Sequence, residues 1–142
     1  MTTPLEAEQI ILNHWLTNWV SGGAKRTSTA FEEENKPDDV EIGVSSWVYL
    51  YVQDVDSEQL SHGAVGYRKF LRKAQVTVDI YTPQNQGIAS ALSLADEART
   101  VFEGQDISPL KNFIGSDIVR VGPKPPEYQI SVICPFEYVE VK

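Results

Sequence analysis

The hydrophobic and polar positions of the chain change period within residues 74–102. Over residues 76–80, apolar and polar side chains alternate, which places one apolar face on a β-strand. A polar turn with Pro83 and Gly87 follows. The apolar positions then recur at helical spacing, at Ile88, Ala91, Leu92, Ala95, Ala98, Val101 and Phe102. A strand that leads through a turn into an amphipathic helix predicts a helix packed on a sheet.

A second amphipathic helix is predicted near the start of the chain. Thr3 is a capping residue, Pro4 suits the first helical position, and Glu6 suits the third. The apolar stripe of this helix consists of Ile11, Trp15, Leu16, Trp19 and Val20. Gly22 and Gly23 then end the helix.

Four further segments have the composition of β-strands. They are residues 27–31, 47–52, 117–121 and 128–134. Pro135 follows the last of them, and because proline cannot donate to a β-ladder, it predicts an edge strand or a bulge there. Together the elements predict an α+β fold, a mainly antiparallel sheet of about four to five strands with two helices packed on one face.

Residues 54–73 form the longest connection without a clean period. This segment holds the basic cluster of the chain, which consists of Arg68, Lys69, Arg72 and Lys73. We expect a mobile loop or hairpin arm here that reaches a neighbouring molecule. The length otherwise suits one domain, residues 1–142.

The strand at residues 47–52 carries large apolar side chains on both faces. One face holds Trp47, Tyr49 and Tyr51, and the other holds Val48, Leu50 and Val52. Such a strand is either buried on both sides or exposes one face to a partner. Because only two helices are available to cover the sheet, the sequence favours an exposed aromatic face at an interface.

The composition weighs against several classes of protein. A net charge of −8 weighs against a protein that reads nucleic-acid sequence, because such a protein needs a basic face. The single cysteine, Cys134, excludes an intramolecular disulfide and indicates a reducing compartment. We expect no signal peptide, and no apolar stretch approaches the roughly 20 residues that a membrane span needs.

The sequence contains no motif for catalysis, a cofactor or a metal. His14 and His62 lie far apart, and the spacings of zinc sites and phosphate-binding glycine loops are missing. Cys134 alternates with core positions, which favours a small buried hydrophobe over a nucleophile. We therefore expect a protein that is not an enzyme and binds neither cofactor nor metal.

Two charged clusters are candidate contacts between copies of the chain. The acidic run Glu32, Glu33 and Glu34 favours a solvated or repulsive rim over a cation site, because hard-cation ligands are spaced around a turn. The basic cluster is either a solvated loop or a clamp for an acidic neighbour, such as residues 32–39 of an adjacent copy.

Several features follow one another in a defined order along the chain. An extended segment closes in Asn35, and the basic loop precedes the strand at residues 76–83. The helix that contains residues 91–96 ends near residues 102–104, and the last strand includes the pair Pro135-Phe136. In this order, over nearly the whole chain, they resemble the tail terminator (tail completion) proteins of long-tailed bacteriophages.

The resemblance implies a structural virion protein that forms a ring, a hexamer in that family. Such a ring caps the completed tail tube, stops tube polymerisation and offers the surface for head joining. The implied partners are further copies of the chain, the tail tube protein and the head-completion protein, with no membrane. Genomic DNA passes through the channel without specific binding. The implied location is the head-proximal end of the virion tail, and the host cytoplasm during assembly.

Two alternatives stay open. One is a small-molecule-binding or enzymatic α+β domain with a pocket between the sheet and its helices, for which Asp79 and His14 are the polar candidates. The other is a different ring of the same machine, a head-tail adaptor.

Overall fold

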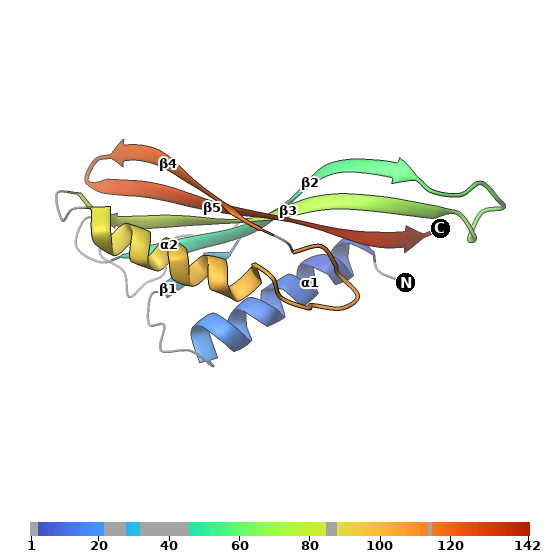
Figure 1. Cartoon of the computed structure of the whole chain (residues 1–142), viewed down its shortest axis with the longest axis horizontal. Helices are drawn as coiled ribbons and strands as arrows, with labels where there is room; N and C mark the ends of the chain where they lie inside the picture. The colour runs from blue at the N-terminus through green and yellow to red at the C-terminus, as the bar shows by residue number, and fades with distance from the viewer. Residues whose placement is uncertain (1–2, 22–27, 32–45, 85–87, 114) are drawn as a thin grey trace.

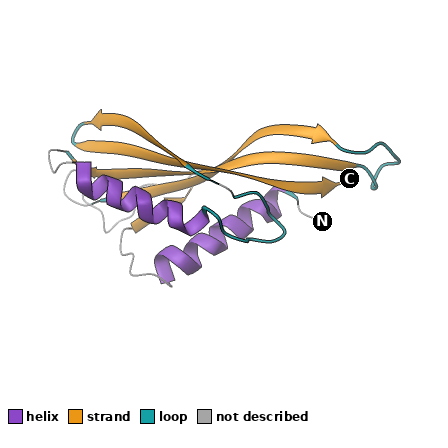
Figure 2. Ribbon diagram, in the orientation of Figure 1, coloured by secondary structure: helices purple, strands orange, loops and turns teal. Residues whose placement is uncertain are grey.

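The computed structural model describes residues 3–21, 28–31, 46–84, 88–113 and 115–142, and Figure 1 traces the chain through them. The elements are α1 (Pro4–Trp15), the π-helix η1 (Leu16–Ser21), β1 (Ser28–Phe31), β2 (Trp47–Gln59), β3 (Lys69–Pro83), α2 (Ile88–Phe102), β4 (Asp117–Lys124) and β5 (Glu127–Val141). The described strands form one sheet, and both α-helices lie on the same side of it (Figure 2).

The sheet has five strands in the order β1-β2-β3-β5-β4. β1 runs parallel to β2, and every other neighbouring pair is antiparallel. The predicted α+β class is therefore confirmed, with two helices on one face of a mainly antiparallel sheet. In the described ranges, no helix is long and apolar enough to cross a membrane.

The first helix begins as the sequence predicts. The Thr3 hydroxyl accepts a hydrogen bond from the backbone N–H of Glu6 at 3.2 Å, and Pro4 occupies the first turn. Ile11, Trp15 and Trp19 are fully buried, as expected. Leu16, however, is exposed, so its expected place in the stripe is wrong. The reason is that the chain enters the wider η1 turn at this residue, which changes the helical period.

The core lies between the helices and one face of the sheet. α2 contributes Ala91, Ala95 and Ala98, all without exposed surface. Their small side chains let the helix backbone lie close to the strands. Larger rings fill the space toward α1, where Trp15 stacks on Trp19 at 4.5 Å between ring centroids. The strands complete the core with Val48, Leu50, Val76, Val78, Ile80, Ile130 and Val132.

Residues 54–73, expected as a mobile loop or hairpin arm, lie in the β2–β3 hairpin. The two strands pair as far as Gln59 opposite Phe70, with a bulge between Asp54 and Asp56. β5 also pairs with β3 out to Val141. The three strands extend past the helices toward the right of Figure 1. We call this extension the arm.

Pro135 lies where β5 is locally an edge and does not mark a bulge. β5 lies between β3 and β4, and its pairing with β3 shows no register shift at Gln75 opposite Pro135. β4, however, begins with Asp117 opposite Ile133, so no β4 residue pairs with Pro135 or needs a donor from it. The expected edge is therefore confirmed at Pro135, although the rest of β5 is an inner strand.

The helix–sheet packing is tested by placing one charge on each face of α2. Ala95→Asp buries a carboxylate in the core and is expected to lower the free energy of unfolding by about 3 kcal/mol or more. Ser93→Asp makes the same change on the exposed side of the helix, with an expected effect of about 0.5 kcal/mol or less. Urea unfolding followed by tryptophan fluorescence measures both. Equal stability of the two variants would contradict the assigned helix face.

Candidate interaction surface on the helix-free face

Side chains alternate between the two faces of a strand, so the residues between the core positions lie on the face away from the helices. Three of them from each long strand form one group, in which the register pairs Asp79 with Tyr49 and Ser131, and Tyr81 with Trp47 and Gln129. We call this group the aromatic face: Trp47, Tyr49 and Tyr51 from β2, Thr77, Asp79 and Tyr81 from β3, and Glu127, Gln129 and Ser131 from β5.

The aromatic side chains form contacts with one another, one between strands and one within β2. The Trp47 ring stacks on Tyr81 at 4.5 Å between centroids, and its Nε1 donates a hydrogen bond of 2.8 Å to Glu127. Tyr49 and Tyr51 meet at 5.6 Å in a tilted arrangement. All four rings are partly exposed, whereas Val48 and Leu50 on the other face of β2 are fully buried. The structure thus leaves the three aromatic residues that the sequence singled out partly exposed on one face of β2.

A polar centre lies beside these rings. Asp79 is only 9% exposed, and the Ser131 hydroxyl donates a hydrogen bond of 2.6 Å to its carboxylate. Among the described residues, the buried Thr77 hydroxyl and the Gln129 side-chain carbonyl have no hydrogen-bond partner. Buried polar atoms without partners destabilise a fold, and binding sites are among the places where they occur.

Tyr81 was not among the candidates from the sequence. The sequence did contain a signal for it: Tyr81 continues the alternation of residues 76–80 on the same face as Thr77 and Asp79. Burial, together with the negative charges of Asp79 and Glu127, raises the pKa of Tyr81 to about 12. The hydroxyl therefore stays protonated well beyond neutral pH.

Arg72 forms an ion pair within its own subunit. Its Nε donates a hydrogen bond of 2.9 Å to Glu140, and a second guanidinium nitrogen lies 2.8 Å from the same carboxylate oxygen. The guanidinium also lies 4.8 Å from the centre of the Phe70 ring. Because these bonds join β3 to β5 within one subunit, a charge reversal at Arg72 would damage the fold as well as any interface.

The other three residues of the basic cluster form no ion pair like that of Arg72 among the described residues. Lys69 and Lys73 are exposed, and strand alternation places both on the side of β3 opposite Arg72. Arg68 donates a long hydrogen bond of 3.4 Å to the backbone carbonyl of Lys142. The acidic candidates Glu32, Glu33 and Glu34 lie outside the described residues.

Cys134 is a core residue in the structure. It is 1% exposed, and burial raises the pKa of its thiol to about 12, with a smaller contribution from the charge of Glu103. A thiol in this state is a poor nucleophile at neutral pH. The sequence-based interpretation of Cys134 as a small buried hydrophobe is confirmed.

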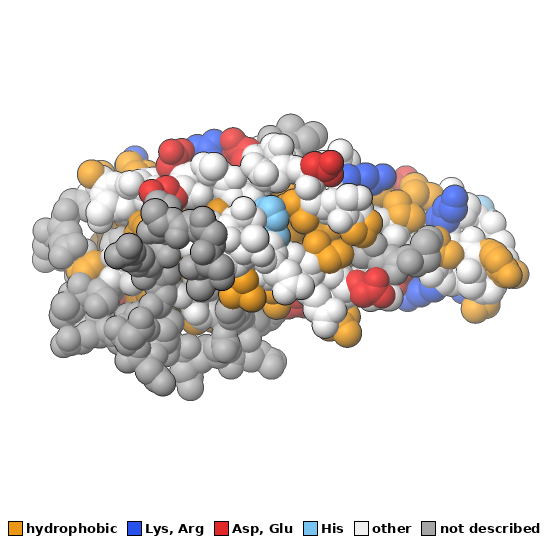
Figure 3. Space-filling model, turned by 90° about the horizontal axis from the view of Figure 1, so that it is seen from below, with side chains coloured by type: hydrophobic (Ala, Val, Ile, Leu, Met, Phe, Trp, Pro, Cys, Tyr) orange, Lys and Arg blue, Asp and Glu red, His pale blue; other side chains and the backbone are white. Residues whose placement is uncertain are grey.

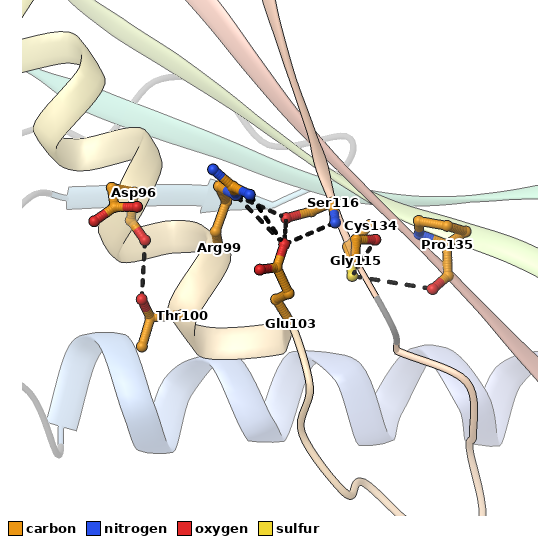
Figure 4. Close-up of polar contacts among 8 residues, drawn as sticks. All are labelled: Asp96, Arg99, Thr100, Glu103, Gly115, Ser116, Cys134 and Pro135. Carbon is orange, nitrogen blue, oxygen red and sulfur yellow. Dashed lines mark hydrogen bonds and ion pairs between the residues drawn. The ribbon is translucent and has the colours of Figure 1, made fainter.

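The polar cluster next to Cys134 joins two elements (Figure 4). The Glu103 carboxylate accepts hydrogen bonds from the Ser116 hydroxyl at 2.6 Å and the Ser116 backbone N–H at 2.8 Å, and Arg99 lies 3.3 Å away. The bonds from Ser116 are the main reason why the pKa of Glu103 is lowered. This cluster ties the end of α2 to the residue before β4, which is a structural task.

The structure does not bring the two polar candidates for a ligand pocket together. Asp79 lies on the aromatic face, whereas a ring nitrogen of His14 lies 2.7 Å from the carbonyl oxygen of Val101 in the helical layer. A hollow of about 340 Å³ between η1 and α2 has neither of them among its described lining residues. In the part of the chain that the structure describes, no three His, Cys, Asp or Glu side chains are placed to hold a metal ion.

Comparison with known proteins identifies the fold alone. No protein-family model matches the sequence, and a search of curated proteins returns no match. A solved structure without a descriptive name superposes with a TM-score of 0.65 at 12% sequence identity, covering 94% of this chain and 96% of that chain. The α+β architecture is therefore shared with a known structure over nearly the whole length.

The environment of Tyr81 has a measurable consequence at high pH. Between pH 10 and about 12, the unfolded chain loses the Tyr81 proton while the folded protein retains it, so stability falls as pH rises. Tyr81→Phe is expected to make this fall shallower in urea unfolding curves recorded at several pH values. Tyr67→Phe is the matched control, because Tyr67 is 77% exposed. Identical pH dependence in the two variants would contradict the environment assigned to Tyr81.

Proposed function

We propose that this protein is a structural virion protein of the tail-terminator type. It forms a ring of identical subunits that caps the completed tail tube, stops the addition of tube subunits and offers a surface for head joining. The observation that carries the proposal is the aromatic face, a sheet surface that no described helix covers and on which four aromatic rings stay partly exposed.

The chemistry of the aromatic face supports a protein partner. Tyrosine and tryptophan are enriched in protein interfaces because they combine a large apolar area with a polar group. The Trp47–Glu127 hydrogen bond holds one ring in place before any partner arrives, which lowers the entropy cost of binding. Beside these rings, the buried Thr77 hydroxyl has no hydrogen-bond partner among the described residues.

The net charge of the chain supports a ring through which DNA passes. A net charge of −8 gives a ring of several subunits a strongly negative wall. Such a wall repels the phosphate backbone, so genomic DNA passes through the channel without adhering. The proposed partners are the tail tube protein and the head-completion protein, and the proposed location is the head-proximal end of the tail. Before assembly the protein resides in the host cytoplasm.

Interrupting the gene in its parent phage tests the proposal. Without a terminator, tube polymerisation has no stop, so electron micrographs of lysates are expected to show overlong tubes and unjoined heads. The wild-type gene supplied in trans is expected to restore tails of uniform length. Tails of normal length that fail to join heads would overturn the proposal in favour of a head-tail adaptor ring.

A second measurement examines the purified protein. Native mass spectrometry of the protein released from capped tubes is expected to show a ring of identical subunits, a hexamer if the resemblance holds. A thermal-shift screen with metabolites serves as the contrast, because a ligand of the folded state raises the melting temperature. A large shift with one metabolite, together with a monomer on tubes, would favour the small-molecule alternative.

A further inference from the structure

The end of the β2–β3 hairpin differs in charge from the rest of the protein. Residues 60–69, which we call the tip, contain Arg68 and Lys69 and no acidic residue. Since the whole chain carries −8 and the tip carries +2, the remaining residues carry −10. Copies of such a chain repel one another over most of their surface. The tip is the part that an acidic neighbour attracts.

The tip also exposes large apolar side chains. Val65 is 80% exposed, Tyr67 77% and Leu60 49%. Figure 3 shows hydrophobic side chains beside basic ones at the right-hand end of the molecule. The arm reaches beyond both helices, so no described helix lies near enough to cover these residues (Figure 1). An apolar cluster of this kind, next to charges, is typical of a contact site.

Backbone hydrogen bonds hold the tip in one conformation. The N–H of Leu60 donates to the carbonyl of Lys69 at 2.8 Å, and the N–H of Tyr67 donates to Ala64 at 3.0 Å. The N–H of Lys142 donates to Arg68 at 2.9 Å, which fastens the end of β5 to the hairpin. A tip that is ordered before binding loses little conformational entropy when it docks.

The aromatic face is complementary to the tip. Its rings offer apolar area for Val65 and Tyr67, and the faces of tyrosine rings attract cations. Asp79 and Glu127 lie beside these rings, each less than a tenth exposed, and give this part of the sheet a negative charge. An Arg or Lys side chain placed over a tyrosine there is attracted by the ring face and by the nearby carboxylates.

The two surfaces lie at opposite ends of the sheet. β2 begins with Trp47 in the aromatic face and ends with Gln59 next to the tip, and its 13 residues span about 40 Å. A subunit therefore cannot close its own tip on its own aromatic face. Two different patches joining successive copies make a heterologous contact, the kind that generates rings.

We propose that the tip of one subunit seats on the aromatic face of the next. Val65 and Tyr67 pack against the rings, while Arg68 and Lys69 lie over the tyrosines near Asp79 and Glu127. This inference rests on the proposed function, since it names the contact that would close the ring. The contact weakens as salt concentration rises, because Lys69 of the tip is exposed and salt screens its charge.

Photo-cross-linking of the full-length protein locates the contact. A benzophenone amino acid at position 67, in protein assembled on tail tubes, is expected to form adducts between copies. Mass spectrometry is expected to place these adducts on residues 47–51 or 79–81. The same probe at Val119, exposed on β4, is expected to give a different map. Adducts from position 67 elsewhere, or none between copies, would overturn the inference.

Two double variants with the same net charge measure how much the contact between the tip and the aromatic face contributes to self-association. Arg68→Glu with Lys69→Glu reverses the tip, and self-association is expected to weaken about tenfold or more. Lys111→Glu with Arg120→Glu gives the same net charge at exposed positions outside both surfaces, and near wild-type association is expected. Circular dichroism checks that both variants are folded. Equal association of the two variants would overturn the inference.

The outcomes separate this inference from the proposed function. If the wild-type protein caps tubes but the tip does not cross-link to the aromatic face, the contact is wrong and the terminator function stands. If the purified protein cross-links from tip to face but its loss leaves tail length unchanged, the contact stands and the terminator function is wrong.

Discussion

The pairing of β3 with β5 is the constraint on which the other features depend. The two strands align over fifteen residues each, from Lys69 opposite Val141 to Pro83 opposite Glu127, with no register shift. Because side chains alternate with a period of two, a slip of one residue would carry the whole apolar set to the other face. This register places Val76, Val78 and Val132 under the helices. It also aligns Asp79 with Ser131 on the aromatic face.

The same strand pair is longer than the helical layer that covers it. Where the helices end, the sheet continues as the arm and has no second apolar layer among the described elements (Figure 1). Val55 and Leu60 consequently stay exposed. Charged residues on neighbouring arm strands, such as Asp56 opposite Lys73, limit uncontrolled association of such a sheet. A subunit with a face that no described helix covers at one end and an exposed tip at the other suits ordered assembly, which is the physical basis of the proposed ring.

Much of the local structure follows from the order of residues alone. The alternation at residues 76–80 assigns the core face of β3, and the helical spacing assigns the buried alanines of α2, because both periods are properties of the backbone. The division of β2 into an aromatic and an aliphatic face was predictable for the same reason. The prediction failed at Leu16, where a change from α- to π-helical geometry altered the period without a sign in the pattern.

The assembly of the candidate site needed the tertiary structure. Which residues lie beside the aromatic side chains of β2 depends on register between strands that are distant in sequence, and no local pattern encodes it. Only the fold could join Glu127 to Trp47, pair Arg72 with Glu140, and place Pro135 just beyond the start of β4, where β5 is locally an edge. Sequence by itself determined which side chains share a face, since that is set by backbone geometry. The tertiary structure decided which faces are covered, since that is set by packing between distant segments.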